Sequence, residues 1–128
     1  MSEGVRELTS HKVDGLNEAL RIEVLDEPGP GNACHTYRIV ANNGEPIAQP
    51  IYCEVQFQKG PIQENGVNGI SNEALLAIVE HRLLGFQSGP FACQENAIAL
   101  NYVQAAMMSL QKRTRDRMAR GVEGTNEK

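Results

Sequence analysis

The sequence of 128 residues contains no tryptophan and only three phenylalanines and three tyrosines. Its core must therefore be built mainly from leucine, isoleucine, valine, alanine and methionine. It also lacks a run of about 20 apolar residues, the length that a helix needs to cross a bilayer. The first residues, MSEGVRELTSHK, contain no apolar stretch of the kind found in signal peptides. We therefore expect no membrane span, no membrane partner and no secretory signal.

Cysteine is scarce as well. The three cysteines, Cys34, Cys53 and Cys93, form no CxxC pair, and an odd number of this kind is typical of reduced thiols in a cytosol. The histidines are scattered, and the adjacent Cys34 and His35 are poorly spaced for joint ligation of one zinc ion. We expect a cytoplasmic protein with no metal site and no cofactor.

A catalytic constellation is also missing from the sequence. No GxSxG, HxH, HExxH or P-loop motif occurs, and the carboxylates of Glu54, Glu80, Glu95 and Asp116 are not paired in a way that indicates acid–base chemistry. The glycine-rich stretch ENGVNGIS precedes a predicted helix and can present backbone N–H groups to an anion. A flexible turn between a strand and a helix is the simpler interpretation of this stretch. No enzymatic activity is expected.

The chain length and a hydrophobic content of 41% predict one domain over residues 1–128 with a packed core. Residues 1–15 are polar and without periodicity, which indicates a flexible arm. Residues 16–60 are predicted to form the β-sheet part, because apolar and polar residues alternate over 20–26, and residues 35–41 and 51–57 have strand character too. Short strands joined by turn-rich links predict an antiparallel sheet of three or four strands.

The second half predicts a helical hairpin over residues 71–120. Ser71 is a suitable N-cap for a helix over 72–87, and Pro90 suits the first turn of a second helix over about 90–120. Gly121 is a natural residue to follow that helix, and residues 121–128 form a polar tail. The predicted fold class is α+β, a small antiparallel sheet followed by a long two-helix hairpin.

The two predicted helices differ in length, which creates a packing problem. Helices of 16 and about 30 residues are ~24 Å and ~45 Å long. The shorter helix cannot cover the far half of the longer one, which carries Met107, Met108, Leu110 and Met118. The shorter helix is also apolar around more than one face. We infer that copies of the chain associate through these helices.

Positive charge is concentrated near the end of this acidic chain. The segment KRTRDRMAR, residues 112–120, holds five basic residues and one acid and is therefore +4, whereas the rest of the chain is −8 (−4 − 4 = −8). Arg113, Arg117 and Arg120 are spaced i, i+4, i+7 and share one face of a helix. A solvated helix end that complements the helix dipole is one interpretation. A pocket for a small anion is the other, since a general nucleic-acid binder usually has a basic surface rather than a pI of about 5.4.

Several motifs together resemble one known family. They are DEPGPGN, FQxGP, LLAIV, GPFACxENA and KRTxDRxxRGVEGT, spread from about residue 10 to residue 126. In this combination the chain resembles the phage anti-Thoeris signal-sponge family, which shares a helical hairpin with phage anti-CBASS cyclic-nucleotide sponges. The resemblance implies a protein that binds glycocyclic ADP-ribose in the cytoplasm of an infected bacterial host and holds it without cleaving it.

The resemblance also implies roles for particular residues. Phe86 is expected to stack on adenine, Asn96 to make a polar contact, and Arg113 and Arg117 to bind the phosphates. Some members hold cyclic di- or trinucleotides in separate pockets. The candidate residues for such a second nucleotide site are Arg120, Gly121, Val122, Gly124 and Thr125.

The predicted ligand-binding residues are too far apart to share a ligand within one chain. Asn96 and Arg113 are 17 positions apart (113 − 96 = 17) on one predicted helix, which corresponds to ~25 Å. A cyclised ADP-ribose is shorter than this. The site must therefore combine the hairpin apex of one subunit with the arginine end of another, as an antiparallel dimer allows twice by symmetry. By resemblance, such dimers build a hexamer.

Two alternatives stay open at the level of sequence. The first is an enzyme that degrades the same cyclic nucleotide signals, which would need a water-activating group near the arginines. The nearest carboxylate in sequence is Asp116. The second is a small regulatory protein that uses the basic segment to bind phosphate or nucleic acid, and its binding would depend steeply on salt. The sponge interpretation predicts no binding of a nucleic-acid polymer.

Overall fold

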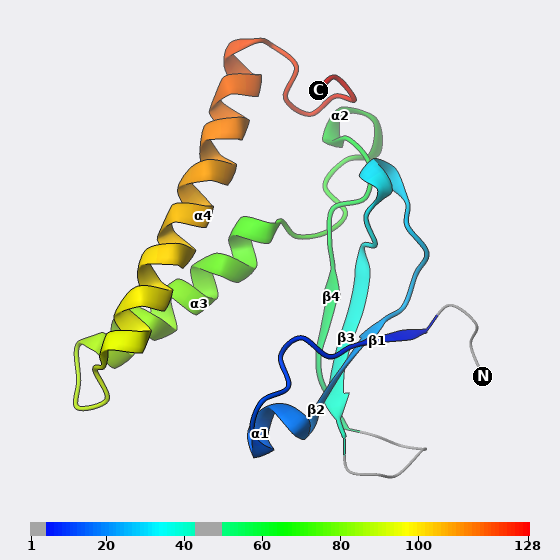
Figure 1. Cartoon of the computed structure of the whole chain (residues 1–128). Helices are drawn as coiled ribbons and strands as arrows, with labels where there is room; N and C mark the ends of the chain where they lie inside the picture. Colours follow the sequence, from blue (N-terminus) through cyan, green and yellow to red (C-terminus); the bar gives the residue numbers. More distant parts are fainter. Residues whose placement is uncertain (1–4, 43–49) are drawn as a thin grey trace. The chain divides into compact units, whose positions relative to one another are not determined.

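The computed structural model describes residues 5–42 and 50–128, and these fold into two compact units (Figure 1). One unit consists of the chain up to Gly60 together with Val67–Ile70 and contains the sheet. The other consists of Pro61–Gly66 and Ser71–Lys128 and contains the helical hairpin. The predicted fold class, α+β with an antiparallel sheet before the helices, is confirmed. The first four residues of the predicted arm lie outside the described residues.

The first unit is a four-stranded antiparallel sheet whose strands follow one another in chain order. Its strands are β1 (Arg6–Leu8), β2 (Leu20–Val24), β3 (Thr36–Ala41) and β4 (Ile51–Gln56). The last three confirm the predicted strands. β1 lies within residues 1–15, the predicted arm, and Arg6 of this strand donates to Glu27 Oε1 at 3.1 Å and to the Asp26 carbonyl at 2.6 Å. A short helix, α1 (Gly15–Glu18), connects β1 to β2 and is capped by Asp14.

The strands form where apolar and polar residues alternate in the sequence. Successive side chains then point to opposite faces of the sheet, so that one face is apolar and the other is polar. Ile22 pairs with Ile39, and Ile39 with Cys53, so these side chains occupy one face. The most buried apolar residues of the described chain belong to the same sheet: Val24, Val40, Ala41 and Val55. Beyond the end of β4, the Phe57 ring packs edge-on against Tyr37, with ring centroids 5.7 Å apart.

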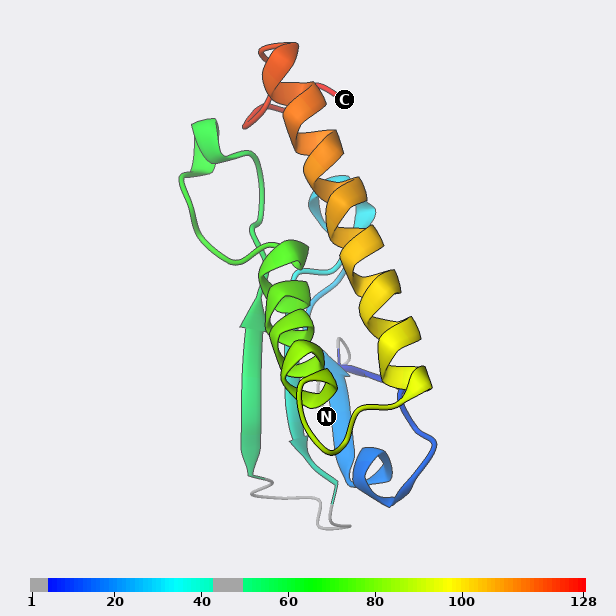
Figure 2. The ribbon, with the colours of Figure 1, turned by 90° about the vertical axis from the view of Figure 1, so that its left-hand side faces the viewer.

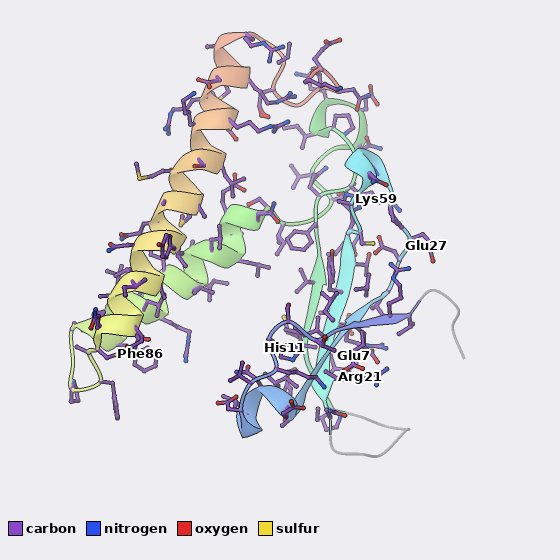
Figure 3. All side chains as sticks on the ribbon, in the orientation of Figure 1. Glu7, His11, Arg21, Glu27, Lys59 and Phe86 are labelled. Carbon is purple, nitrogen blue, oxygen red and sulfur yellow. The ribbon has the colours of Figure 1, made fainter. Side chains whose placement is uncertain are left out.

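The polar side of the sheet is stabilised by an ion-pair network around Glu23. Its carboxylate accepts from Arg38 Nη2 at 2.6 Å and from Arg21 Nε at 2.9 Å, and Arg21 also reaches Glu7, near which it lies in Figure 3. Burial raises the pKa of Glu23, but the hydrogen bonds and positive charges of the two arginines lower it further, so its pKa lies below the usual value. Folding therefore favours the ionised form of Glu23.

The DEPGPGN motif forms the turn between β2 and β3, including the 3₁₀ turn η1 (Pro30–Asn32). Asp26 anchors this turn because its carboxylate accepts from the backbone N–H groups of His35 and Thr36 at 2.9 and 3.1 Å. Burial raises the pKa of Asp26, and these bonds outweigh that effect and lower it. Gly31 at φ 73° takes the left-handed conformation that the turn requires.

The segment after β4 belongs in part to the second unit, over Pro61–Gly66, and in part to the first, over Val67–Ile70. It includes the short helix α2 (Ile62–Asn65), which lies in a region predicted to be loop and has Gly66 as its C-cap. The segment then returns to β4, where Ile70 N–H donates to the Gln56 carbonyl at 2.8 Å. Gly69 packs so closely there that a Cβ atom would lie 2.4 Å from the Phe57 carbonyl carbon. Only glycine fits at this position without a backbone shift.

The second unit is built on the hairpin of α3 (Asn72–Gln87) and α4 (Gln94–Ala119), whose joined ends form its apex (Figures 1 and 2). Ser71 caps α3 by accepting from Ala74 N–H at 3.1 Å, as predicted. α4 begins four residues later than the predicted Pro90 (94 − 90 = 4), so that boundary was wrong. The side-chain amide of Gln87 bonds to both the N–H and the carbonyl of Cys93, which holds residues 88–93 in a turn.

The hairpin leaves most of its apolar side chains exposed. Neither helix contains a buried apolar residue, and Ile78, Tyr102 and Met108 are 61%, 73% and 66% exposed. Among the described helices, none has both the length and the apolar character needed to cross a membrane. Within residues 5–42 and 50–128, no group of three or more His, Cys, Asp or Glu side chains is arranged to hold a metal ion.

Candidate functional site

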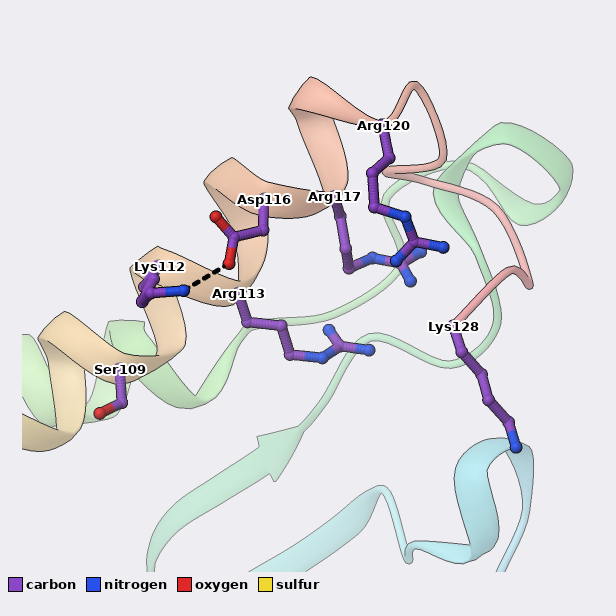
Figure 4. A pocket seen from close by; sticks show the side chains of 7 residues that line it. All are labelled: Ser109, Lys112, Arg113, Asp116, Arg117, Arg120 and Lys128. Carbon is purple, nitrogen blue, oxygen red and sulfur yellow. Dashed lines mark hydrogen bonds and ion pairs between the residues drawn. The ribbon is translucent and has the colours of Figure 1, made fainter.

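A basic pocket of about 350 Å³ lies at the C-terminal end of α4 (Figure 4). We call it the basic pocket, and its lining residues are Ser109, Lys112, Arg113, Asp116, Arg117, Arg120 and Lys128. Five of the seven are cationic and one is anionic, which gives the lining a formal charge of +4 (5 − 1 = 4). The pocket forms because helical spacing brings residues 113, 117 and 120 to one face of α4. Its composition suits a multiply charged anion.

The cations of the basic pocket differ in how far they are already paired. Lys112 forms an ion pair with Asp116, with Nζ 2.7 Å from Oδ2, on the exposed surface of the helix. The guanidinium groups of Arg113 and Arg120 make no hydrogen bond or ion pair with any residue that the structure describes. Both point to the same side of α4 (Figure 4). Their donors are available to a phosphate.

Arg117 is paired much more extensively than its neighbours. It is 5% exposed, and its guanidinium donates to the carbonyls of Val122 and Thr125 at 2.9 and 3.1 Å and to the carbonyl of Glu127. Its Nε also donates to Glu123 Oε1 at 3.2 Å. Four of the five N–H donors of a guanidinium are thereby used within the chain. Arg117, which was predicted to bind a phosphate, therefore bonds to residues 122–127, which were predicted to be a polar tail.

The residues of the candidate second nucleotide site therefore belong to a folded segment. α4 ends at Ala119 with Arg120 as its C-cap, and Gly121 follows in the left-handed conformation at φ 74°, as predicted for that position. The Gly124 carbonyl accepts from Gln63 N–H of α2 at 3.1 Å, and a Cβ atom at Gly124 would lie 3.0 Å from Ile62. α2 and Arg117 thus hold this segment between them.

The other two predicted ligand residues lie at the hairpin apex. Phe86 is 38% exposed, and the guanidinium of Arg82, one turn earlier on α3, lies 5.3 Å from its ring centroid. Asn96 lies in the first turn of α4, and ~25 Å of helix separates it from Arg113. The structure therefore brings Arg113, Arg117 and Arg120 together but places Phe86 and Asn96 outside the basic pocket of the same chain.

Sequence reasoning missed three residues of these two regions. Ser109 and Lys128 line the basic pocket, and Arg82 covers Phe86. Two of them could have been found from helical i, i+4 spacing. Ser109 lies four residues before Arg113, and Arg82 lies four residues before Phe86. Lys128 reaches the pocket through the fold of the preceding segment, which leaves no periodic signal.

The fold and the basic pocket define a small α+β protein whose helical hairpin carries a cluster of cationic side chains. The chain belongs to the family described as "Acb2/Tad1, hairpin domain", whose model matches residues 49–115. It is also 53% identical over 74 residues to "Thoeris anti-defense 1" of Bacillus phage SBSphiJ7, a match that covers 58% of this chain. The chain spans 52% of that relative's length. The family predicted from the sequence motifs is confirmed.

Proposed function

We propose that this protein is a viral anti-defence sponge that binds and sequesters nucleotide immune signals in the cytoplasm of an infected bacterial cell. The expected ligands are glycocyclic ADP-ribose isomers. The observation that carries the proposal is the basic pocket on the hairpin of a chain whose relative is named for anti-defence against Thoeris. Two adjacent phosphates present several oxygens at short range. The guanidiniums of Arg113 and Arg120, which pair with no residue that the structure describes, can each donate bidentate bonds to them.

Sequestration without cleavage is supported by the surroundings of the pocket's carboxylate. Hydrolysis needs a group that can take a proton from water. Asp116 is the carboxylate lining the basic pocket, and it is held in an ion pair with Lys112. One of its carboxylate oxygens is thereby engaged by an ammonium group. The proposed role therefore depends on affinity and on the number of sites, because each occupied site removes one signal molecule.

We propose further that each complete ligand site is shared between two copies of the chain. Phe86 and Asn96 of one hairpin apex would contact the base, and Arg113 and Arg117 of another chain would contact the phosphates, the latter through its charge and its remaining donor. The exposed apolar side chains of α3 and α4 supply a surface for such contact: Ile78, Val79, Leu84, Ile98, Tyr102 and Met108. A dimer with two equivalent sites follows, and a hexamer built from such dimers is the larger assembly that we expect.

A second class of ligand is part of the proposal. Cyclic di- or trinucleotides would bind at the segment that includes Arg120, Gly121, Val122, Gly124 and Thr125. Arg120 offers a guanidinium that pairs with none of residues 5–42 and 50–128, and glycine allows a ligand to approach the backbone closely. Binding of this class should be independent of Phe86, because the hairpin apex is not part of that segment.

The proposed function is tested by native mass spectrometry with a panel of cyclic ADP-ribose isomers and cyclic oligonucleotides, followed by mass analysis of the released ligand. A sponge returns the ligand intact, and Arg113→Ala weakens its binding. A ligand of altered mass would instead identify an enzyme. A preference for linear nucleic acid with a steep salt dependence would identify a phosphate-binding regulator.

A further inference from the structure

We propose that Asp116 is a specificity-determining residue of the basic pocket and accepts a hydrogen bond from a sugar hydroxyl next to the bound phosphates. This role rests on the proposed function, because it takes the pocket as the site of a nucleotide's phosphates. The observation behind it is a carboxylate among five cationic side chains that line the same pocket (Figure 4). A pocket for phosphate alone gains nothing from a negative charge, which repels the ligand. A pocket for a phosphorylated sugar needs an acceptor as well as donors.

The stability of α4 does not explain a carboxylate at this position. Asp116 lies in the last turn of the helix, where the helix dipole disfavours negative charge. Its ion pair with Lys112 has the cation on the N-terminal side, which is the less stabilising order for an i, i+4 pair. The side chains of Lys112 and Asp116 are also 73% and 59% exposed, and exposed ion pairs contribute little to stability. The role of Asp116 therefore lies in what the pocket binds.

Helical spacing places Asp116 in the middle of the residues that line the pocket. A rotation of ~40° about the helix axis separates it from Lys112 on one side and from Arg120 on the other. Asp116 Oδ2 accepts from Lys112, and its Oδ1 makes no hydrogen bond with any residue that the structure describes. Ser109 lies two turns earlier on nearly the same line of the helix, ~10 Å away. A ligand that places its phosphates over the arginines can therefore place a sugar over Asp116.

The chemistry of a carboxylate determines which ligands it favours. An ionised carboxylate accepts hydrogen bonds and donates none, so it can bond to a sugar hydroxyl but not to an ionised phosphate oxygen. A bond from a hydroxyl to a carboxylate is charge-assisted and about twice as strong as a neutral one. The repulsion between Asp116 and a phosphate is weakened by water and salt, because the carboxylate is exposed. The pocket should therefore favour a ribose-bearing diphosphate over a bare polyphosphate.

The test compares the binding of inorganic pyrophosphate and of ADP-ribose to the full chain by calorimetry. Both ligands contain a pyrophosphate group, but only ADP-ribose carries ribose hydroxyls. In Asp116→Ala, the affinity for pyrophosphate should rise about threefold, because a repulsive charge is removed, and high salt should reduce this gain. The affinity for ADP-ribose should fall at least about threefold, because losing a charge-assisted bond costs about tenfold or more and outweighs the same gain. A general loss of structure would instead lower both affinities.

Two control variants separate this role from a general effect of charge. Lys112→Met removes the other partner of the ion pair and should weaken the binding of both ligands by a similar factor. Glu54→Ala, on β4, removes a carboxylate that does not line the pocket and should leave both affinities unchanged. An affinity for ADP-ribose that does not fall in Asp116→Ala, or an equal fall for pyrophosphate, would overturn the role of Asp116. Opposite changes in a protein that binds no cyclic ADP-ribose isomer would support this role and overturn the proposed function alone. A wild-type protein that binds neither probe would overturn both.

Discussion

Two inactive variants of this protein should restore each other's binding if each ligand site is shared between two chains. Asn96 and Arg113 both lie on α4, and the ~25 Å of helix between them exceeds the reach of a cyclised ADP-ribose. Asn96→Ala should therefore damage the half of the site that one chain supplies. Arg113→Ala should damage the half that its partner supplies.

The expected magnitudes follow from hydrogen bonding and symmetry. Removing Arg113, which has no partner among the described residues, should cost ~1.5–3 kcal/mol of ligand binding, or about ten- to a hundredfold in affinity, because its bonds to phosphate are charge-assisted. After random subunit exchange about half of the dimers are mixed. In a mixed antiparallel dimer one site carries both defects and the other carries none, so about a quarter of all sites should bind normally.

The assay counts high-affinity sites by calorimetry after the two variants have been mixed, with exchange verified by native mass spectrometry. The matched control mixes Arg113→Ala with Arg120→Ala. These residues line the same pocket, so every site in a mixed dimer keeps one defect and binding should not return. Confirmed exchange without restored sites in the first mixture would refute the shared site.

Three further predictions concern stability and stacking. Folding lowers the pKa values of Glu23 and Asp26. The free energy of unfolding should therefore decrease as the pH falls below their ordinary pKa values of 4.5 and 3.8. Urea titrations should show a weaker pH dependence in Glu23→Gln. In thermal denaturation, Gly69→Ala should lower the free energy of unfolding by about 1–3 kcal/mol, because the added Cβ clashes with the backbone of Phe57. The control Gly85→Ala lies in a helix with open space around the added Cβ and should raise the free energy of unfolding by up to about 1 kcal/mol. Phe86→Ala should lose about 1–3 kcal/mol of ligand binding and keep its fold; if it unfolds while Phe86→Leu binds normally, stacking is excluded.

The elements with strong local signals were predictable from the sequence. Alternation located β2, and Ser71 located the start of α3, because capping and periodicity are properties of neighbouring residues. β1 has only three residues, too few for a pattern, and it is stabilised by pairing with β2. The start of α4 depends on the bonds between Gln87 and Cys93, which form only once the chain has turned.

The candidate site was predictable to the extent that it lies on one helix face. The spacing of Arg113, Arg117 and Arg120 was sufficient to predict a basic cluster. The pairing of Arg117 was not predictable, because three of its acceptors are main-chain carbonyls, which every residue possesses. The direct roles of Phe86 and Asn96 stay predictions until a ligand complex is measured.

The chain crosses from one unit to the other more than once, and this affects how the protein can be divided into fragments. The polypeptide passes from one unit to the other at residues 60–61, 66–67 and 70–71. A fragment cut at Ser71 would contain both long helices but would lose α2, whose Gln63 bonds to the Glu123 and Gly124 carbonyls. A fragment cut at Pro61 would keep α2 but would separate Ile70 from Gln56 of β4. A hairpin transplanted onto another protein would therefore need to carry β4 with it, and the graft point belongs before Ile51.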